Sequence, residues 1–185
     1  PGQGKSLLDM HMILSDITRG IGVALLDPHG DLAEDVLCHL PESALDKVIY
    51  FNPGDPDWVP LWNPMHSPAE HDIGPATGNL VGVLKSFVTG WGDRMEHLLR
   101  HAIFGLKHLP ATTLLDVYEL LQPKSPASEI HRKRILEVVD NEVARQFWRE
   151  DFDTYAASEF GPPKHKLSKL LVGGTAALML SQPYN

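Results

Sequence analysis

A glycine-rich run near the start of the chain leads directly into a helical pattern, and this junction restricts the possible folds most strongly. The run comprises Pro1, Gly2, Gln3, Gly4, Lys5 and Ser6. From Ser6 to about Arg19 apolar residues recur at helical spacing, and Gly20 is placed to end the helix. A glycine-rich turn at the positive end of a helix presents backbone N–H groups to anions. The junction therefore predicts a phosphate-binding loop.

Each side chain in the run has a task in phosphate binding. Lys5 supplies a positive charge that can reach the β and γ phosphates, and the Ser6 hydroxyl can ligate the Mg²⁺ that bridges them. We therefore predict ATP and Mg²⁺ as cofactors, with Lys5 as a catalytic residue and Ser6 as the metal ligand. The predicted cofactor-binding residues are Gly2, Gln3, Gly4, Lys5, Ser6 and Leu7. The alternative is an ordinary helix start in which the Gly-Lys-Ser tripeptide is incidental.

The phosphate-loop pattern is not complete in this sequence. The full pattern is G-x-x-x-x-G-K-[ST], and its first glycine would fall before Pro1 if Gly4 is the second. The strand that feeds such a loop would lie there as well, and the chain opens without methionine. We therefore expect this sequence to be an internal piece of a longer protein.

Two short apolar runs alternate with helical segments after the junction. Residues 21–26 form a continuous apolar run that stops at Asp27, and residues 47–51 form a second run. Such runs are typical of strands buried on both faces of a parallel sheet. A helix is expected between them, capped by Asp31 and extending to about Leu40. This alternation predicts an α/β fold, with these residues forming the front half of a nucleotide-binding sheet.

Asp27 and Asp31 follow the first of the predicted strands. The carboxyl edge of a doubly wound sheet is where such folds present residues to their ligands. We therefore predict both carboxylates as tentative catalytic residues, which would orient a water molecule or respond to the γ phosphate. The alternative for Asp31 is a simple helix cap after a tight turn, and His29 between them is expected to be a turn residue.

The composition changes after Asn52, where prolines follow at 53, 56, 60, 64 and 68. We expect an irregular connector at 52–68, a first domain at residues 1–64 and a second domain at residues 65–185. Helical periodicity in the second domain is found at 70–90, 93–109, 112–121, 127–140, 141–152 and 164–172. Gly161, Pro162 and Pro163 predict a turn between helices, and the second domain is expected to be mostly α-helical.

Charge and cysteine content exclude some classes of protein. The chain has 24 acidic and 16 basic residues and a formal net charge of −8, which excludes a uniformly basic surface that coats nucleic acid but leaves room for a local basic groove. The single cysteine, Cys38, has apolar neighbours and is expected to be a buried thiol in a reducing compartment. No apolar run approaches the roughly 20 residues that a membrane span requires.

Three further groups of side chains have both a functional and a structural interpretation. His97 and His101 beside Glu96 resemble part of a zinc site, but no third ligand pattern is evident. The basic residues at 131–134 and at 164, 165, 166 and 169 offer contacts to nucleic-acid phosphates, although solvated helix faces are favoured. The aromatic residues Trp91, Phe104, Phe147 and Trp148 lie among apolar neighbours and are expected to pack in the core.

The chain resembles the HerA/FtsK superfamily of DNA-pumping ATPases, in particular the TraG/TraD type of type IV secretion coupling protein. The resemblance is carried by GQGKS at 2–6, GVALLDPHGDL at 22–32, LWNP at 61–64, WGDRMEH at 91–97 and FW at 147–148. It spans nearly the whole sequence. The aspartate, proline and glycine after the first predicted strand are its most specific part.

This resemblance implies a partial RecA-like P-loop NTPase sheet followed by an all-α domain. It also implies a homo-hexameric ring around DNA, ATP hydrolysis that moves the strand, and secretion or relaxosome proteins as further partners. The family's hydrolytic carboxylate lies on a later strand, so we expect this piece alone to be inactive as an ATPase. A cytoplasmic location is implied, with any attachment to the inner membrane through a segment outside this sequence.

Two other functions remain open at the level of sequence. The first is a P-loop NTPase of another class, such as a nucleotide switch or a remodelling ATPase, in which Lys5 and Ser6 act without DNA. The second is a non-catalytic helical docking module. DNA affinity that falls steeply with salt distinguishes the translocase from the first alternative, and nucleotide binding distinguishes it from the second.

Overall fold

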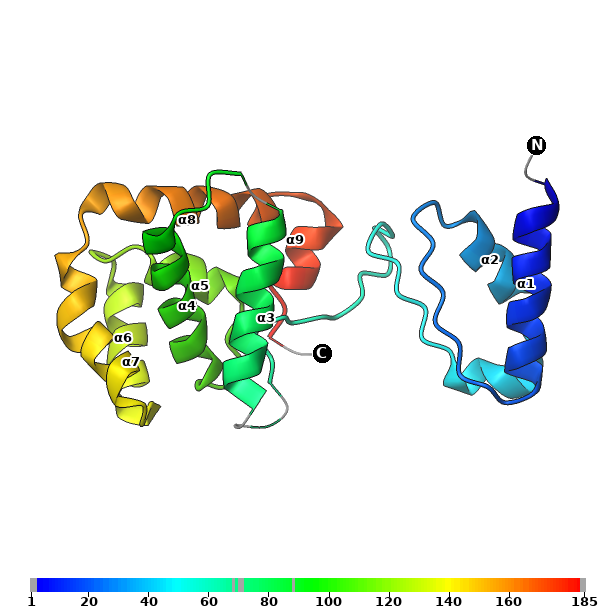
Figure 1. Cartoon of the computed structure of the whole chain (residues 1–185), viewed down its shortest axis with the longest axis horizontal. Helices are drawn as coiled ribbons and strands as arrows, with labels where there is room; N and C mark the ends of the chain where they lie inside the picture. Colours follow the sequence, from blue (N-terminus) through cyan, green and yellow to red (C-terminus); the bar gives the residue numbers. More distant parts are fainter. Residues whose placement is uncertain (1–2, 68, 70–71, 88, 184–185) are drawn as a thin grey trace. The chain divides into compact units, whose positions relative to one another are not determined.

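The computed structural model describes residues 3–67, 69, 72–87 and 89–183, and every regular element in those ranges is helical (Figure 1). Pro1, Gly2 and Pro68, which belong to the predicted phosphate loop and connector, lie outside the described residues. The chain divides into two compact units, Pro1–Phe51 and Asn52–Asn185. The predicted domain boundary after residue 64 lies inside the second unit and stays a prediction.

In the described part of the first unit, helices are joined by irregular segments (Figure 1). The helices are α1 (Gln3–Thr18), α2 (Asp31–Cys38) and the 3₁₀-helix η1 (Glu42–Lys47). Helix α1 packs against α2, with Met10 and Val36 as buried apolar side chains. This small contact holds the unit together, since most other apolar side chains of residues 3–51 are at least partly exposed.

The end of α1 follows the sequence prediction. Gly20 has a φ of 77°, a left-handed conformation that glycine adopts without steric cost. Its N–H donates to Ile17 O at 2.9 Å, and the Ile21 N–H donates to Asp16 O at 2.9 Å. This pair of bonds is a Schellman motif, which satisfies carbonyl groups that the helix end would otherwise leave free.

The predicted strands are absent from the described residues, so the predicted α/β fold class with a partial RecA-like sheet is wrong. Residues 21–26 and 48–51 are irregular, and Lys47 ends η1. Leu26 is 88% exposed and Ile49 is 92% exposed, so these apolar runs are not buried. A strand requires a hydrogen-bonded partner. The runs have the composition of strands, but a local pattern does not report whether a partner is present.

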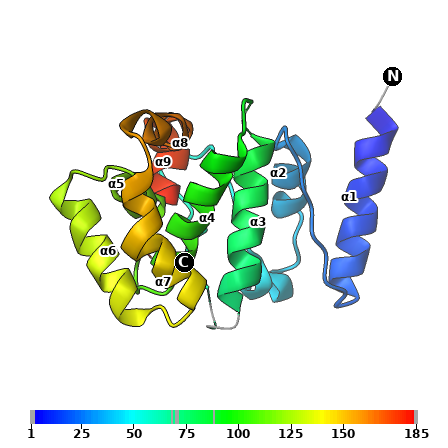
Figure 2. The same cartoon turned by 60° about the vertical axis from the view of Figure 1, so that its left-hand side comes forward.

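The described part of the second unit is a helical bundle, as predicted for this region (Figure 2). Its helices are α3 (Ile73–Ser86), α4 (Asp93–Lys107), α5 (Leu114–Leu120), α6 (Pro126–Val138), α7 (Glu142–Gln146), the π-helical turn η3 (Phe147–Asp151), the 3₁₀ turn η4 (Phe152–Thr154), α8 (Ala157–Leu171) and α9 (Gly174–Leu180). Helix α4 is central: it contacts α3, α5, α6 and α8. Leu98, Ala102, Ile103 and Leu106 form its fully buried face.

Near the end of the chain one prediction is wrong, and one helix has no prediction to match it. The predicted turn at Gly161, Pro162 and Pro163 lies inside α8, and α9 was not predicted. Proline removes a backbone donor from a helix. Helix α8 tolerates this because Phe160, Pro163 and Leu167 lie on one helical face and are all buried. Packing therefore outweighs the local preference for a break.

Buried polar contacts fix the connector to the bundle. Described residues 52–67 are irregular, as predicted. Asn63 Nδ2 donates to Thr112 O at 2.8 Å. The buried Lys107 ammonium donates to Pro64 O at 3.0 Å and Met65 O at 3.1 Å, and burial lowers the pKa of Lys107. The LWNP motif thus has a structural role, because its backbone and amide groups join the connector to α4 and to the segment before α5.

The aromatic residues pack as predicted, whereas the cysteine does not. Phe147 and Trp148 are each 1% exposed, and Trp91 and Phe104 are partly buried against the same core. Cys38 is exposed at the end of α2, so the predicted buried thiol is wrong. Several residues near Cys38 in the sequence are apolar, but the core of the first unit is too small to bury the thiol as well. Among the described residues, none of the helices combines the length and apolar character that a bilayer span requires.

Candidate functional site

The predicted phosphate-binding residues lie at the start of α1. Gly4, Lys5, Ser6 and Leu7 are exposed in the first turns of this 16-residue helix, and Gly4 is helical rather than part of a preceding loop. The first turn contains no acidic side chain. The first backbone N–H groups of a helix have no intrahelical partner, and the helix dipole adds positive potential there. With Lys5 beside them, these groups form an exposed electropositive helix end.

Asp27 has a clear structural role at the start of α2. Its Oδ1 accepts a hydrogen bond from His29 N at 3.0 Å, and its Oδ2 accepts from Leu32 N at 2.9 Å and Ala33 N at 3.2 Å. The bond from His29 is the largest cause of the lowered pKa of Asp27. The carboxylate therefore satisfies the free N–H groups at the N-terminus of α2.

The predicted cap at Asp31 is wrong, because Asp27 takes that task. The residue in the N-cap position is Gly30, with a φ of 89°, and Asp31 is an exposed residue of the first turn. Gly30 allows the chain to turn so that the Asp27 carboxylate reaches across to the helix. Of the two predicted carboxylates, Asp31 is thus the one whose side chain faces solvent.

The two parts of the predicted nucleotide site lie toward the same end of the first unit. After the Schellman turn the chain runs back from the C-terminal end of α1, so the turn after Asp27 lies toward the end where α1 begins (Figures 1 and 2). This arrangement brings the start of α1, which carries Lys5 and Ser6, and the start of α2, which carries Asp31, toward one end, although the described residues of this unit form no sheet.

The predicted zinc alternative at His97 and His101 is not supported. The His101 ring stacks on Phe147 with ring centroids 4.0 Å apart, and His97 Nδ1 lies 2.8 Å from the Tyr155 hydroxyl. Burial, followed by the neighbouring His97, lowers the pKa of His101 to about 4. Both rings therefore belong to the aromatic packing around Phe147.

Glu96 also has a structural role, as a hydrogen-bond acceptor. It accepts hydrogen bonds from Lys85 Nζ at 2.9 Å, Trp91 Nε1 at 2.8 Å and Arg100 Nη2 at 3.0 Å. The bond from Lys85 is the largest cause that lowers the pKa of Glu96 to about 2. The WGDRMEH motif thus joins the end of α3, the following turn and α4 through one carboxylate.

The predicted basic residues have different environments. The Arg132 guanidinium donates to Asp153 Oδ2 at 2.9 Å and to Trp148 O at 3.3 Å, so it is a structural residue. Lys133 and Arg134 are exposed. His131 is buried and faces away from this group toward α5. The sequence cluster at 131–134 is therefore not one basic patch.

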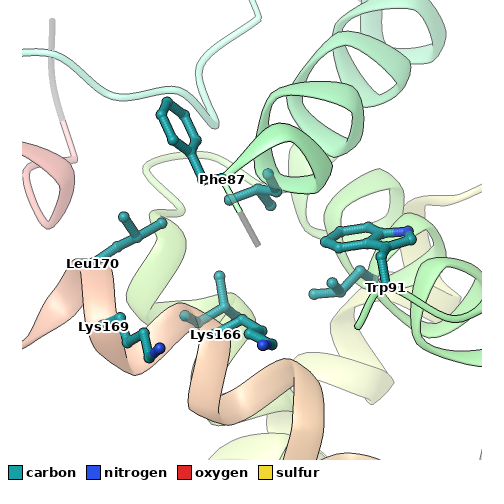
Figure 3. A pocket seen from close by; sticks show the side chains of 8 residues that line it. Phe87, Trp91, Lys166, Lys169 and Leu170 are labelled. Carbon is teal, nitrogen blue, oxygen red and sulfur yellow. The ribbon is translucent and has the colours of Figure 1, made fainter. Parts of the chain in front are cut away.

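The lysines of α8 lie beside an apolar pocket (Figure 3). The pocket measures about 60 Å³ and is lined by Leu84, Phe87, Trp91, Leu99, Lys166, Leu167, Lys169 and Leu170. Lys166 Nζ donates to Thr89 O at 2.9 Å, and Phe87 is 73% exposed. Small-molecule sites are commonly about 300 Å³ or larger, so this pocket is too small for a nucleotide. It offers lysines next to exposed aromatic surface.

A second cluster was missed by the sequence analysis. Asp116 and Glu119 of α5 and His131 of α6 each place one ligand atom within 4.8 Å of the other two. The i, i+3 spacing of the two acidic residues was a signal that could have been read from the sequence. The contribution of His131 could not, because it depends on how α6 packs against α5.

Comparison of the chain with protein-family models, curated proteins and solved structures finds no match. The resemblance to DNA-pumping ATPases therefore rests on the sequence motifs alone.

Proposed function

We propose that this chain is the ATP-binding part of an ATP-driven DNA translocase or coupling protein, which moves DNA as in conjugative transfer or type IV secretion. The observation that carries the proposal is the placement of Lys5 and Ser6 in the exposed first turn of α1, where no acidic side chain opposes an anion. The motif supplies the residue types, and the helix end supplies the electrostatic field. The protein acts as a P-loop ATPase in this proposal.

Each residue of the proposed site has a distinct task. Backbone N–H groups at residues 3–6 donate hydrogen bonds to the phosphate oxygens, Lys5 neutralises the β and γ phosphates, and the Ser6 hydroxyl ligates Mg²⁺. Gly4 leaves room for the phosphates, since no atom lies within 4 Å of the position of a Cβ there. Asp27 holds the turn by capping α2, and the exposed Asp31 is free to contact a metal-bound water. Bound Mg²⁺ would supply charge for phosphoryl transfer.

DNA is the proposed macromolecular partner. The net charge of −8 excludes contact over the whole surface, so phosphates must be met locally. Lys166 and Lys169 beside the exposed Phe87 combine cationic and aromatic groups, which is the combination that binds single strands through phosphates and stacked bases (Figure 3). A homo-hexamer in the cytoplasm, attached to the inner membrane through a segment outside this sequence, completes the proposal.

The test compares Lys5→Ala with Lys47→Ala, an exposed lysine of the same unit. With the intact protein, we expect Lys5→Ala to lose binding of a fluorescent ATP analogue and to lose DNA-stimulated hydrolysis, whereas Lys47→Ala retains both. Equal nucleotide binding by both variants would contradict the phosphate site. If the protein hydrolyses ATP at the same rate with and without DNA, the assignment as an ATPase stands and the assignment as a DNA translocase is rejected. This chain alone is expected to show no ATP turnover.

One observation favours the docking module as a second candidate. The helical unit has its own core and an apolar pocket at its surface, neither of which requires a nucleotide. If the intact protein binds no ATP analogue at all, the docking function becomes the better assignment.

A further inference from the structure

The helical unit contains a cluster of metal-ligating side chains that is separate from the residues of the proposed ATP site. Asp116 and Glu119 lie three residues apart on α5, and His131 lies on α6, which packs against α5. His131 Nε2 is 3.4 Å from Asp116 Oδ1 and 3.5 Å from Glu119 Oε2. One nitrogen thus faces two carboxylate oxygens at nearly equal distances.

His131 is an unusual buried side chain because its ring lacks hydrogen bonds among the described residues. The side chain is 10% exposed, its Nδ1 is buried without a partner, and its Nε2 makes the two long contacts above. A hydrogen bond from N–H to oxygen normally spans about 2.7–3.2 Å. Buried polar groups are nearly always paired, so an imidazole with no bond at either nitrogen requires an explanation.

The separations fit a metal ion better than they fit a direct hydrogen bond. Zinc binds nitrogen and oxygen ligands at about 2.0–2.1 Å in tetrahedral geometry, which places neighbouring ligand atoms about 3.3 Å apart. Both distances from His131 Nε2 are close to that value. Two carboxylates and a neutral imidazole also balance the charge of a divalent ion.

Hydrogen bonds orient one side chain of the cluster, and solvent reaches another. Asp116 Oδ2 accepts hydrogen bonds from Thr113 N at 2.7 Å and Thr113 Oγ1 at 2.9 Å, which directs Oδ1 toward His131. Such outer contacts orient metal ligands. The Glu119 side chain is 39% exposed, so the ion can enter from solvent and retain a water molecule.

We propose that Asp116, Glu119 and His131 bind one divalent transition-metal ion, with zinc as the preferred ion. Imidazole favours zinc over magnesium or calcium, which prefer oxygen ligands alone. Because His131 Nδ1 has no supporting acceptor within the part of the chain that the structure describes, affinity should be about 10–100-fold weaker than at a site with a complete outer shell. The inference does not depend on ATP binding.

The test is titration of the full chain, without an affinity tag, with Zn²⁺ by calorimetry and with Co²⁺ by visible absorption. We expect one ion per chain and Co²⁺ absorption typical of a four-coordinate site. Glu119→Gln keeps the size of the side chain and should weaken binding at least tenfold, whereas Glu137→Gln, an exposed residue of α6, should not change it.

Thermal unfolding checks that the variants are folded and gives a second readout. Zn²⁺ should raise the melting temperature of the wild type and of Glu137→Gln but not that of Glu119→Gln. Saturable binding that Glu119→Gln retains would place the ion elsewhere and overturn the proposal. The absence of one-to-one binding in the wild type would overturn it as well, and would leave His131 as an imidazole between two carboxylates.

Discussion

Gly105 in the last turn of α4 provides the sharpest test of the packing in the helical unit. A Cβ added at this position would lie 3.0 Å from both Cδ1 and Cγ2 of Ile135 and 3.2 Å from Nε1 of Trp148. Both neighbours are essentially fully buried, so neither can move aside without disturbing the core. We therefore expect Gly105→Ala to destabilise the unit, although alanine is the better helix former.

The magnitude follows from two opposing contributions. Replacing glycine by alanine inside a helix stabilises by about 0.8–1.0 kcal/mol, and overpacking a core by one methyl group costs about 1–3 kcal/mol. The net result is a loss of about 1 kcal/mol. Gly82→Ala in α3 is the matched control, since no atom lies within 4 Å of its Cβ position. It should gain up to about 1 kcal/mol.

Thermal and urea unfolding, followed by near-ultraviolet circular dichroism, would measure this difference. One kcal/mol corresponds to roughly 2–8 °C in melting temperature for domains of this size class. We expect Gly105→Ala to melt below the wild type and Gly82→Ala above it. A Gly105→Ala variant at least as stable as the wild type would show that α4, α6 and η3 pack less closely than described.

Three further perturbations have defined outcomes. Asp27→Ala removes the acceptors for the first amides of α2 and should destabilise the start of that helix, seen as faster hydrogen exchange of the Leu32 and Ala33 amides. Because the pKa of His101 falls from 6.5 to about 4 on folding, the unfolded state binds more protons between these values. Stability should therefore decrease by about 1 kcal/mol, after discounting for partial exposure, as the pH falls through that window, and His101→Phe should flatten the profile. Lys107→Met removes the donor to the connector and should raise hydrogen exchange at Met65 while leaving α4 protected.

The sequence predicted local features well where one segment contains all the necessary information. The periodicity after Ser6 and the glycine at position 20 are sufficient to define α1 and its end. Residues 21–26 show the limit of such reasoning, because an apolar run indicates a need for burial but not the partner that would provide it. The double proline at 162–163 shows the converse, since packing maintains a helix that local preference would end.

The candidate sites likewise contain features that one segment of sequence predicts and features that depend on packing between segments. The position of Lys5 and Ser6 at a helix start could be predicted from the sequence, because one segment contains the whole pattern. The cap of α2 could not be assigned correctly, because Asp31 is adjacent in sequence while Asp27 reaches the helix only through the turn at Gly30. His131 was grouped with its basic neighbours in sequence, and only the packing of α6 turns it toward Asp116.

The uncovered apolar side chains at 21–26 and 48–51 have a practical consequence for handling the chain in solution. The exposed apolar side chains of Leu26 and Ile49 favour association with other molecules, including further copies of this chain. Electrostatic repulsion between chains that each carry a net charge of −8 opposes this association. Since salt screens such repulsion within about 8 Å at physiological ionic strength, dilute, low-salt buffers will keep preparations monodisperse, and concentrated, high-salt ones will scatter light.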